Sequence, residues 1–357
     1  MSARKDRGFS LVELMVGVMI GLIGIAIIMQ VFTLSEAQKR TTTSGSDAQS
    51  NGNMAIYGIT RDVRLAGYGF GLSNYGCAVN TSFNGSTATP GVFTLAPVVI
   101  TDAGADGTPA AQGGPYDLPD KIRILYSTAN MGTLPDVVTF PHAQTDTQVQ
   151  LTTNFGIANQ SLLVLFEASK SCTLAQVTAT SGNSFVTHLG GPWNGNVTIF
   201  PAAGYSANNA IYLNMGGMAL RDYFIDPVNG NDLQMTETSA AYGASASNTF
   251  VIAGEIVNIQ AEYGRDSGAH VGHIAGDNVV DTWDNNTPAA GLGGALVAAP
   301  WQQIIAVHVA LLVRSGQYEK PDPVSGFCTQ TTSSAGGGNA PTWTSRPTGL
   351  LAPVATR

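Results

Sequence analysis

An uninterrupted apolar run near the start of the chain constrains this sequence more than any other feature. From Leu14 to Met29 no side chain carries a polar group. Counted on to Leu34, the run forms a helix of roughly 31 Å at about 1.5 Å per residue, which matches the ~30 Å hydrocarbon core of a bilayer. The sequence therefore predicts a membrane-spanning helix.

The flanks of this run indicate its orientation and its processing. Arg4, Lys5 and Arg7 precede it, which places this leader in the cytoplasm and the bulk of the chain on the exported side by the positive-inside bias. An ordinary secretory signal should show a small-residue cleavage site after the run, and no such site follows Met29. The one plausible processing point lies before the run, after Gly8.

A single carboxylate, Glu13, lies at the head of the apolar run. A charged side chain at mid-membrane costs roughly 2.5–3.5 kcal/mol, and less near a helix end, so such residues are usually paired or functional. Cleavage after Gly8 would create an α-amine on Phe9, one helical turn before Glu13. That cation, in the same subunit or in a neighbour, would neutralise the carboxylate inside a dry helix bundle.

Small residues within the span favour close packing of helices. Gly17 and Gly21 form a G-x-x-x-G pair, and Gly24 follows on a similar face. Such residues let helix backbones approach where lipid supplies no hydrophobic drive. The alternative is that these glycines reflect only the general abundance of glycine in membrane helices.

The order of these features resembles the class III signal of type IV pilins and pseudopilins. A basic leader precedes the segment Gly8–Glu13, and about twenty apolar residues follow, the length of a membrane span. The resemblance implies cleavage by prepilin peptidase after Gly8, N-methylation of Phe9, and a role for Glu13 in guiding subunits into a filament. A plain membrane anchor with an incidental glutamate is the alternative.

A second helical pattern follows the span, over residues 35–66. Apolar and small side chains recur at three- and four-residue steps, so this half should lay one stripe against a globular domain. We expect a bend or local melting at Thr41–Gly45, because three threonines and a glycine are poor helix formers. The helix should end at Gly67–Gly71, where glycines alternate. The recurring positions are Ala48, Gly52, Ala55, Ile56, Ile59, Val63 and Ala66.

Beyond the helix the pattern indicates β-structure with long polar loops. The clearest strand is Ile304–Val313, where large apolar side chains alternate with smaller or polar ones. The segment Thr249–Tyr263 is ambiguous and fits a short helix running into a strand. Loops are expected at Asn80–Pro115, Pro227–Ser247 and Ser267–Gly294. The other candidate strands are Lys121–Tyr126, Leu162–Phe166, Ala175–Ala179, Val197–Phe200, Ile211–Leu213 and Ala219–Ile225.

Several later segments are similar to minor pilins of the PilW type, although the tail lacks the arginine-bearing apolar ending of many relatives. The resemblance implies an α+β fold: a long N-terminal α-helix, half membrane-spanning and half amphipathic, packed on a β-rich pilin-like globular domain with long loops. The matching segments are Arg61–Gly69 followed by Cys77, Asp120–Tyr126, Gly254–Gly264, Asp281–Trp283 and Leu311–Ser315.

The chain is therefore expected to divide into five parts. These are a cytoplasmic leader peptide over residues 1–8, a transmembrane and assembly helix over 9–34, an amphipathic continuation over 35–66, a β-rich globular domain over 67–328, and a low-complexity C-terminal tail over 329–357.

Charge and cysteine content narrow the function further. The formal net charge is −8, and removal of the leader lowers it to −10, so we expect no direct binding of nucleic acid. Three cysteines, Cys77, Cys172 and Cys328, lie on the exported side, where disulfides persist. They allow one bridge with one thiol left over, and the sequence leaves the pairing open.

Candidate catalytic and metal-binding residues form only weak patterns. His270 and His273 lie among glycines and have no positioned third ligand for zinc. His142 and His188 are isolated in loop-like contexts. Asp266, Asp277 and Asp281 share one loop and are weak calcium candidates, because the EF-hand spacing and its terminal glutamate are missing; solvated turn residues are the alternative. No nucleophile, P-loop or zinc-protease motif is present, so we expect neither an enzyme nor a cofactor.

The leading interpretation is a structural minor pilin that joins other minor pilins to prime or cap a type IV pilus. Prepilin peptidase, other minor pilins, the major pilin and the inner-membrane assembly platform are the partners that the resemblance implies. The protein would begin in the inner membrane, with an exported C-terminal domain, and end in the pilus at the cell surface. A minor pseudopilin of a type II secretion system and a tip adhesin that binds a surface receptor are the alternatives.

Overall fold

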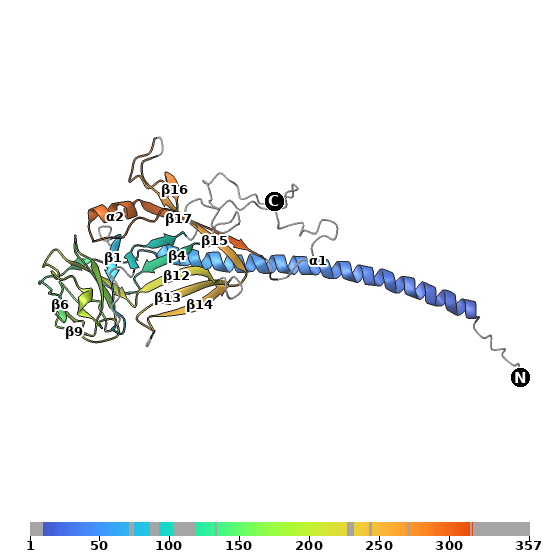
Figure 1. The fold of residues 1–357 in the computed structure, drawn as a ribbon, viewed down its shortest axis with the longest axis horizontal. Coiled ribbons are helices and arrows are strands. Elements are labelled where there is room, and N and C mark those ends of the chain that lie inside the picture. The colour runs from blue at the N-terminus through green and yellow to red at the C-terminus, as the bar shows by residue number, and fades with distance from the viewer. Residues whose placement is uncertain are drawn as a thin grey trace.

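A computed structural model describes residues 10–70, 75–85, 93–102, 119–132, 134–226, 232–242, 245–269, 272–314 and 316. The chain begins with a single long helix, α1 (Leu11–Leu65), and continues as a succession of β-strands. Figure 1 shows the first half of α1 projecting away from a β-rich globular part. The predicted α+β architecture, a long N-terminal helix followed by a β-rich domain, is confirmed.

The helix α1 runs unbroken through Thr41–Gly45, so of the bend or local melting expected there, the local melting is wrong. Within this stretch the Thr42 hydroxyl donates to the carbonyl of Gln38, 2.9 Å away, one turn earlier in the same helix. Its hydroxyl group is therefore satisfied without leaving the helical conformation. At about 1.5 Å per residue, the 55 residues extend roughly 80 Å.

The docked half of α1 ends against the sheets as the glycine pattern predicts. The N–H of Gly67 donates to the carbonyl of Leu125, and the N–H of Ser127 donates to that of Tyr68, both at 2.9 Å. Gly67 has a φ of 75°, and a Cβ atom there would lie 2.9 Å from Cγ of Pro97. Glycine is therefore required where the chain turns off the helix.

Two antiparallel sheets enclose the docked half of α1. One has five strands in the order β14-β13-β12-β4-β3, and the other has three in the order β16-β15-β17. The strands of the first are β14 (Ser247–Ala253), β13 (Asp232–Thr238), β12 (Ala219–Asp226), β4 (Lys121–Tyr126) and β3 (Val98–Thr101). Those of the second are β16 (Thr282–Asp284), β15 (Ile256–Arg265) and β17 (Ile304–Val313).

The remaining strands lie beyond the end of α1 and form two further sheets. A six-stranded sheet has the order β2-β1-β8-β7-β11-β5, and a three-stranded sheet has the order β6-β10-β9. The first contains β2 (Phe93–Leu95), β1 (Cys77–Asn80), β8 (Cys172–Gln176), β7 (Leu162–Phe166), β11 (Ile211–Gly216) and β5 (Asp136–Val137). The second contains β6 (Gln148–Gln150), β10 (Phe185–Thr187) and β9 (Ala179–Ser181).

Three hydrophobic clusters fill the described part of the domain. The first lies between α1 and the two sheets that enclose it, and includes Ala55 and Ile59 of the helix. The second surrounds Cys77 and Cys172, and the third joins the six-stranded sheet to the small sheet β6-β10-β9. The stripe predicted on residues 35–66 therefore packs against the globular domain over its second half. Its residues Ala55, Ile59, Val63 and Ala66 all contribute to the first cluster.

Most of the predicted strands are present, with some differences in extent. The bounds of β4, β7 and β17 agree with the sequence pattern, and β11 and β12 each run further than predicted. The expected strand Ala175–Ala179 is displaced, because β8 begins at Cys172 and ends at Gln176. The expected strand Val197–Phe200 is wrong: Val197–Ile199 is a 3₁₀ helix, in which the Asn196 side chain accepts a bond from the N–H of Thr198.

The ambiguous segment Thr249–Tyr263 holds no helix. It forms the end of β14 and most of β15, separated by a turn in which Glu255 has a φ of 60°. The expected loops also contain strands, because β2, β3, β13 and β16 lie within them, and the short helix α2 (Ala295–Gln302) follows the last of these loops. The C-terminal tail over 329–357 lies outside the described residues.

Candidate assembly surface

The free half of α1 presents a continuous apolar surface. Among the described residues, α1 is the one helix long and apolar enough to cross a membrane, and its most apolar stretch has a mean hydropathy of 2.6. None of that stretch is buried in the rest of the protein. The exposed side chains include Leu11, Val12, Leu14, Met15, Val16, Ile20, Ile23, Ile27 and Phe32. An apolar surface of this size requires lipid or other apolar helices around it.

The predicted assembly residues lie on this free half or just before it. Glu13 is in the first turn of α1, which begins after Ser10. Nothing lies within 4 Å of a Cβ atom built on Gly17 or Gly21, so this glycine face is open to a neighbouring helix. Gly8 and Phe9 precede the described residues, and their roles stay predictions.

A buried charge network joins the other half of α1 to the sheet behind it. Asp62 is fully buried, and its two carboxylate oxygens accept bonds from Nη1 of Arg221 at 2.8 and 2.9 Å. The Tyr223 hydroxyl donates to the same carboxylate at 2.6 Å. Both partners are on β12, and Arg61 adds a bond from the helix itself. The carboxylate is therefore surrounded by donors on one strand and its own helix.

The pKa values of its partners reflect this network. Burial alone would lower the pKa of the Arg221 guanidinium, but the hydrogen bond and charge of Asp62 outweigh it, so that pKa is raised. Burial raises the pKa of the Tyr223 hydroxyl, and its bond to Asp62 raises it further. Arg221 also reaches Glu237 on β13 at 3.3 Å. With both pKa values raised, both groups stay protonated at physiological pH and keep the hydrogen atoms that they donate to Asp62.

The predicted stripe on residues 35–66 does not include Asp62, yet the side chain of Asp62 is fully buried. An aspartate one residue before Val63 looks solvent-exposed by periodicity. Its burial depends on the arginine and tyrosine that β12 supplies from more than 150 residues away. No local signal identifies such a partner.

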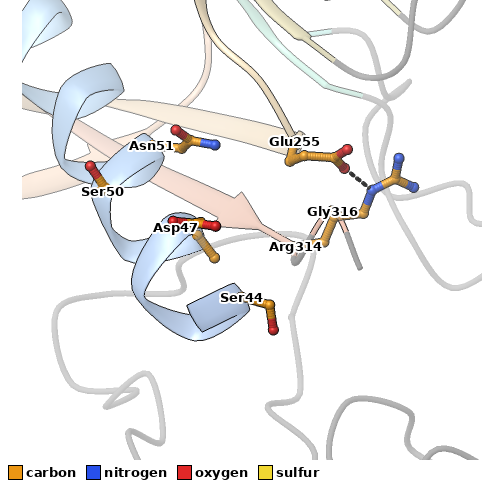
Figure 2. A pocket seen from close by; sticks show the side chains of 8 residues that line it. Ser44, Asp47, Ser50, Asn51, Glu255, Arg314 and Gly316 are labelled. Carbon is orange, nitrogen blue, oxygen red and sulfur yellow. Dashed lines mark hydrogen bonds and ion pairs between the residues drawn. The ribbon is translucent and has the colours of Figure 1, made fainter. Parts of the chain in front are cut away.

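A shallow hollow lies where α1 emerges from the globular part. Its volume is about 330 Å³, and Glu255 and Arg314 form an ion pair at its edge. Figure 2 shows this pair facing the helix segment that carries Asp47 and Asn51. The N–H of Arg314 also donates to the carbonyl of Glu255, which ties the end of β17 to the start of β15. This hollow borders the free half of α1.

A disulfide connects two strands of the six-stranded sheet. Cys77 on β1 is bonded to Cys172 on β8, with their Cα atoms 6.0 Å apart. The sequence left the pairing open, and Cys328 lies outside the described residues. Within this sheet the bridge joins β1, which follows the exit of α1, to its neighbour β8.

The two histidines that seemed isolated in the sequence form a buried pair. Their Nε2 atoms are 2.9 Å apart, with 1% of His142 and 7% of His188 exposed, and Phe200 packs against both rings. Burial lowers the pKa of His142. Burial, with the charge of His142, lowers the pKa of His188 to about 4. The pair is therefore neutral at physiological pH.

We expect the histidine pair to make the domain sensitive to acid. Unfolded histidine titrates near pH 6.5, so the unfolded chain takes up a proton before His188 does, and stability falls as the pH drops from about 6.5 to about 4. The loss for His188 is roughly 3 kcal/mol. Urea unfolding at a series of pH values measures this loss of unfolding free energy. The His188→Gln variant, whose new side chain does not titrate, should lose less stability over the same pH range. An identical loss in the variant and the unchanged protein would exclude the histidine pair as the cause.

The calcium candidates hold their own loop together. The carboxylate of Asp266 accepts from the N–H groups of Gly276 and Asn278, and that of Asp281 accepts from those of Ser267 and Gly268. Asp277 lies 3.3 Å from Nδ1 of His273. His270 lies outside the described residues. Across the described part of the chain, no three His, Cys, Asp or Glu residues are grouped so that they could hold a metal ion.

Comparison with known proteins gives two matches. Residues 222–345 match the family described as Type IV Pilus-assembly protein W, and residues 3–29 match the prokaryotic N-terminal methylation motif. The first region includes β13 to β17, and the second includes the start of the apolar helix. No curated protein and no solved structure matches the chain.

Proposed function

Because this chain belongs to the PilW family of type IV pilus assembly proteins and carries the N-terminal methylation motif, we propose that it is a minor pilin which primes or caps the pilus. The family is structural rather than enzymatic, and the motif implies processing by prepilin peptidase. The finer role, joining other minor pilins beneath or at the pilus tip, is our inference.

One observation carries the proposal: the second half of α1 packs against the globular domain, and the first half of α1 is exposed. The buried Asp62 network fixes the docked half to β12. The free half, from Leu11 to Leu34, offers an apolar surface that suits the inner membrane before assembly and a bundle of like helices after it. A subunit built in this way can leave the lipid without refolding its globular part.

Within the bundle we assign Glu13 the role of pairing with a neighbour's N-terminus. The carboxylate lies in the first turn of the free helix, where no described residue of the globular domain reaches it. Cleavage after Gly8 would supply an α-amine on Phe9 of each subunit. A carboxylate in a dry bundle is stable only with such a partner, so the pairing would fix the register between adjacent helices.

Replacing Gly8 by a larger residue is expected to leave the precursor uncut. The protein would then keep its basic leader, and the mass of the isolated protein would exceed that of the processed form by the eight leader residues. Intact-mass measurement on the membrane fraction distinguishes the uncut precursor from the processed protein. A mature mass starting at Phe9 in the variant would contradict processing at this position.

Glu13→Ala is expected to insert and be cleaved normally but to fail in joining other pilins. The substitution removes the carboxylate while leaving the apolar surface intact, so only the ionic partner is lost. Co-isolation with other pilin subunits, measured after detergent extraction, should fall to background. Glu36→Ala, a change of the other acid in this part of the helix, is the matched control and should co-isolate normally. Unchanged co-isolation of Glu13→Ala would remove this role.

A further inference from the structure

The small sheet β6-β10-β9 forms an outer layer on one face of the six-stranded sheet. Successive residues of β7 point to opposite faces, so Val164 belongs to the second hydrophobic cluster, whereas Leu163 and Leu165 belong to the third. Val149 and Val186 of the small sheet also belong to the third cluster. Figure 1 places β6 and β9 at the end of the domain that lies far from the free half of α1. The small sheet therefore covers one face at this end.

The histidine pair connects the end of β10 to a segment anchored on the six-stranded sheet. The backbone of His142 exchanges two hydrogen bonds with Tyr205, at 2.9 and 2.7 Å. The Tyr205 hydroxyl in turn donates to the carbonyl of Ser171, which directly precedes β8. His188 follows β10, and its N–H donates to the carbonyl of Thr147, directly before β6. The 2.9 Å contact between the two Nε2 atoms is thus a side-chain contact between the small sheet and its support.

This contact cannot persist when both imidazole rings are protonated. A neutral pair places one hydrogen between the two Nε2 atoms, so one ring donates and the other accepts. With both rings protonated, each Nε2 atom carries a hydrogen and neither can accept. Two cations would then face each other in a buried site where Phe200 packs against both rings. Full protonation therefore requires the rings to separate and reach water.

The charged residues described around the pair do not offset this effect. Strands β6, β9 and β10 contain no charged residue, and neither do residues 197–200. The charge of Asp146 raises the pKa of both histidines, but burial lowers these pKa values by more. Beside Tyr205, the ion pair between Glu167 and Lys170 binds the neighbouring backbone. Acid therefore favours a state in which the two rings are solvated.

The small sheet can open without releasing the docked helix. The docked half of α1 packs on the first cluster, and no described residue belongs to both the first and the third cluster. Asp62, which fixes that half of α1, is bound by Arg221 and Tyr223 of β12 rather than by a histidine. Residues 177–178 form the short connection between β8 and β9. An opened small sheet would stay attached to the six-stranded sheet there.

We propose that the contact between His142 and His188 is an acid-sensitive latch, whose protonation lets the small sheet move away from the six-stranded sheet while α1 remains docked. The movement exposes the third hydrophobic cluster at the far end of the subunit. Acid lowers the stability of the whole domain, and the latch places the first opening in this layer. The latch does not depend on the proposed function.

Hydrogen exchange of the full chain in detergent tests the latch, with protection factors corrected for the intrinsic effect of pH on exchange. His188 titrates near pH 6.5 in the opened state and near pH 4 in the closed state. Protection of the amides of β6 and β10 should therefore fall about 30-fold or more between pH 7.5 and pH 5. The fall should disappear when His142→Gln and His188→Gln are combined. His308→Gln, which changes a partly exposed histidine on β17, is the matched control and should retain it.

Exchange in low urea locates the opening and needs no variant. A local opening exposes little surface, so the protection of β6 and β10 at pH 5 should not change when a low concentration of urea is added. Protection around Ile59 and Val63 on α1 should be higher and should fall with urea, because those amides exchange when the whole domain unfolds.

Three results would overturn the latch. The first is equal protection and equal urea dependence in the small sheet and in α1, because the small sheet would then open only with the rest of the domain. The second is unchanged protection of β6 and β10 between pH 7.5 and pH 5. The third is the same fall in the double glutamine variant, since the titrating groups would then lie elsewhere.

Discussion

Replacing Asp62 by asparagine is expected to lower the free energy of unfolding by about 3 kcal/mol or more, because removal of one member of a buried ion pair leaves the other charge buried without compensation. The side chain keeps its shape, so the change isolates the charge. Of the acidic partners that the structure describes for Arg221, Glu237 at 3.3 Å would remain, and the Tyr223 hydroxyl would lose its charged acceptor. Urea unfolding of the full chain in detergent measures the loss.

The effect should also be visible in how the helix is held. Without the carboxylate of Asp62 to bind β12, we expect amide exchange around Ile59 and Val63 to increase well beyond that in the strands of the six-stranded sheet. Asp47→Asn is the matched control, because Asp47 is an exposed aspartate on the same helix, and its effect should stay within about 0.5 kcal/mol. Equal effects of the two substitutions would mean that the network does not anchor α1.

Removal of the disulfide by Cys77→Ala with Cys172→Ala is expected to cost about 4–5 kcal/mol. The two cysteines are 95 residues apart, and a cross-link over a loop of that length strongly restricts the unfolded chain. Both side chains are fully buried in the second hydrophobic cluster, so alanine leaves no unpaired polar group behind. The midpoint of urea unfolding under oxidising conditions should fall accordingly.

The third cysteine provides the control for this experiment. Cys328→Ala should leave the unfolding midpoint of the oxidised protein unchanged, and a reducing agent should lower the midpoint of this variant as much as that of the unchanged protein. If Cys328→Ala alone reproduced the full loss, the bridge that matters would involve Cys328 rather than the pair Cys77–Cys172.

The sequence was most reliable where the signal is local and repeated. The length of the apolar run and the period of the stripe after it predicted α1, and the alternation of apolar side chains over ten residues predicted β17. The resemblance to PilW-type minor pilins and to the methylation motif is confirmed by the matches to residues 222–345 and 3–29.

Prediction failed where short elements depend on distant partners. β2 and β13 lie in stretches whose glycine and asparagine content favours loops, and they are strands because β1 and β12 pair with them. The segment Thr249–Tyr263, which was ambiguous in sequence, contains strands and no helix because β13 and β17 supply the hydrogen-bonding partners of β14 and β15. A periodicity argument contains no information about such neighbours.

The amino-acid sequence alone determined that this chain carries an apolar helix with an acid near its start, followed by a β-rich domain, since solvent preference and residue spacing suffice for both. Tertiary structure decided which polar groups are buried. Asp62 meets Arg221, His142 meets His188 and Cys77 meets Cys172 only after segments more than 40 residues apart are brought together. The physical reason is that a buried charge, a neutral imidazole pair and a disulfide each require a specific partner in space.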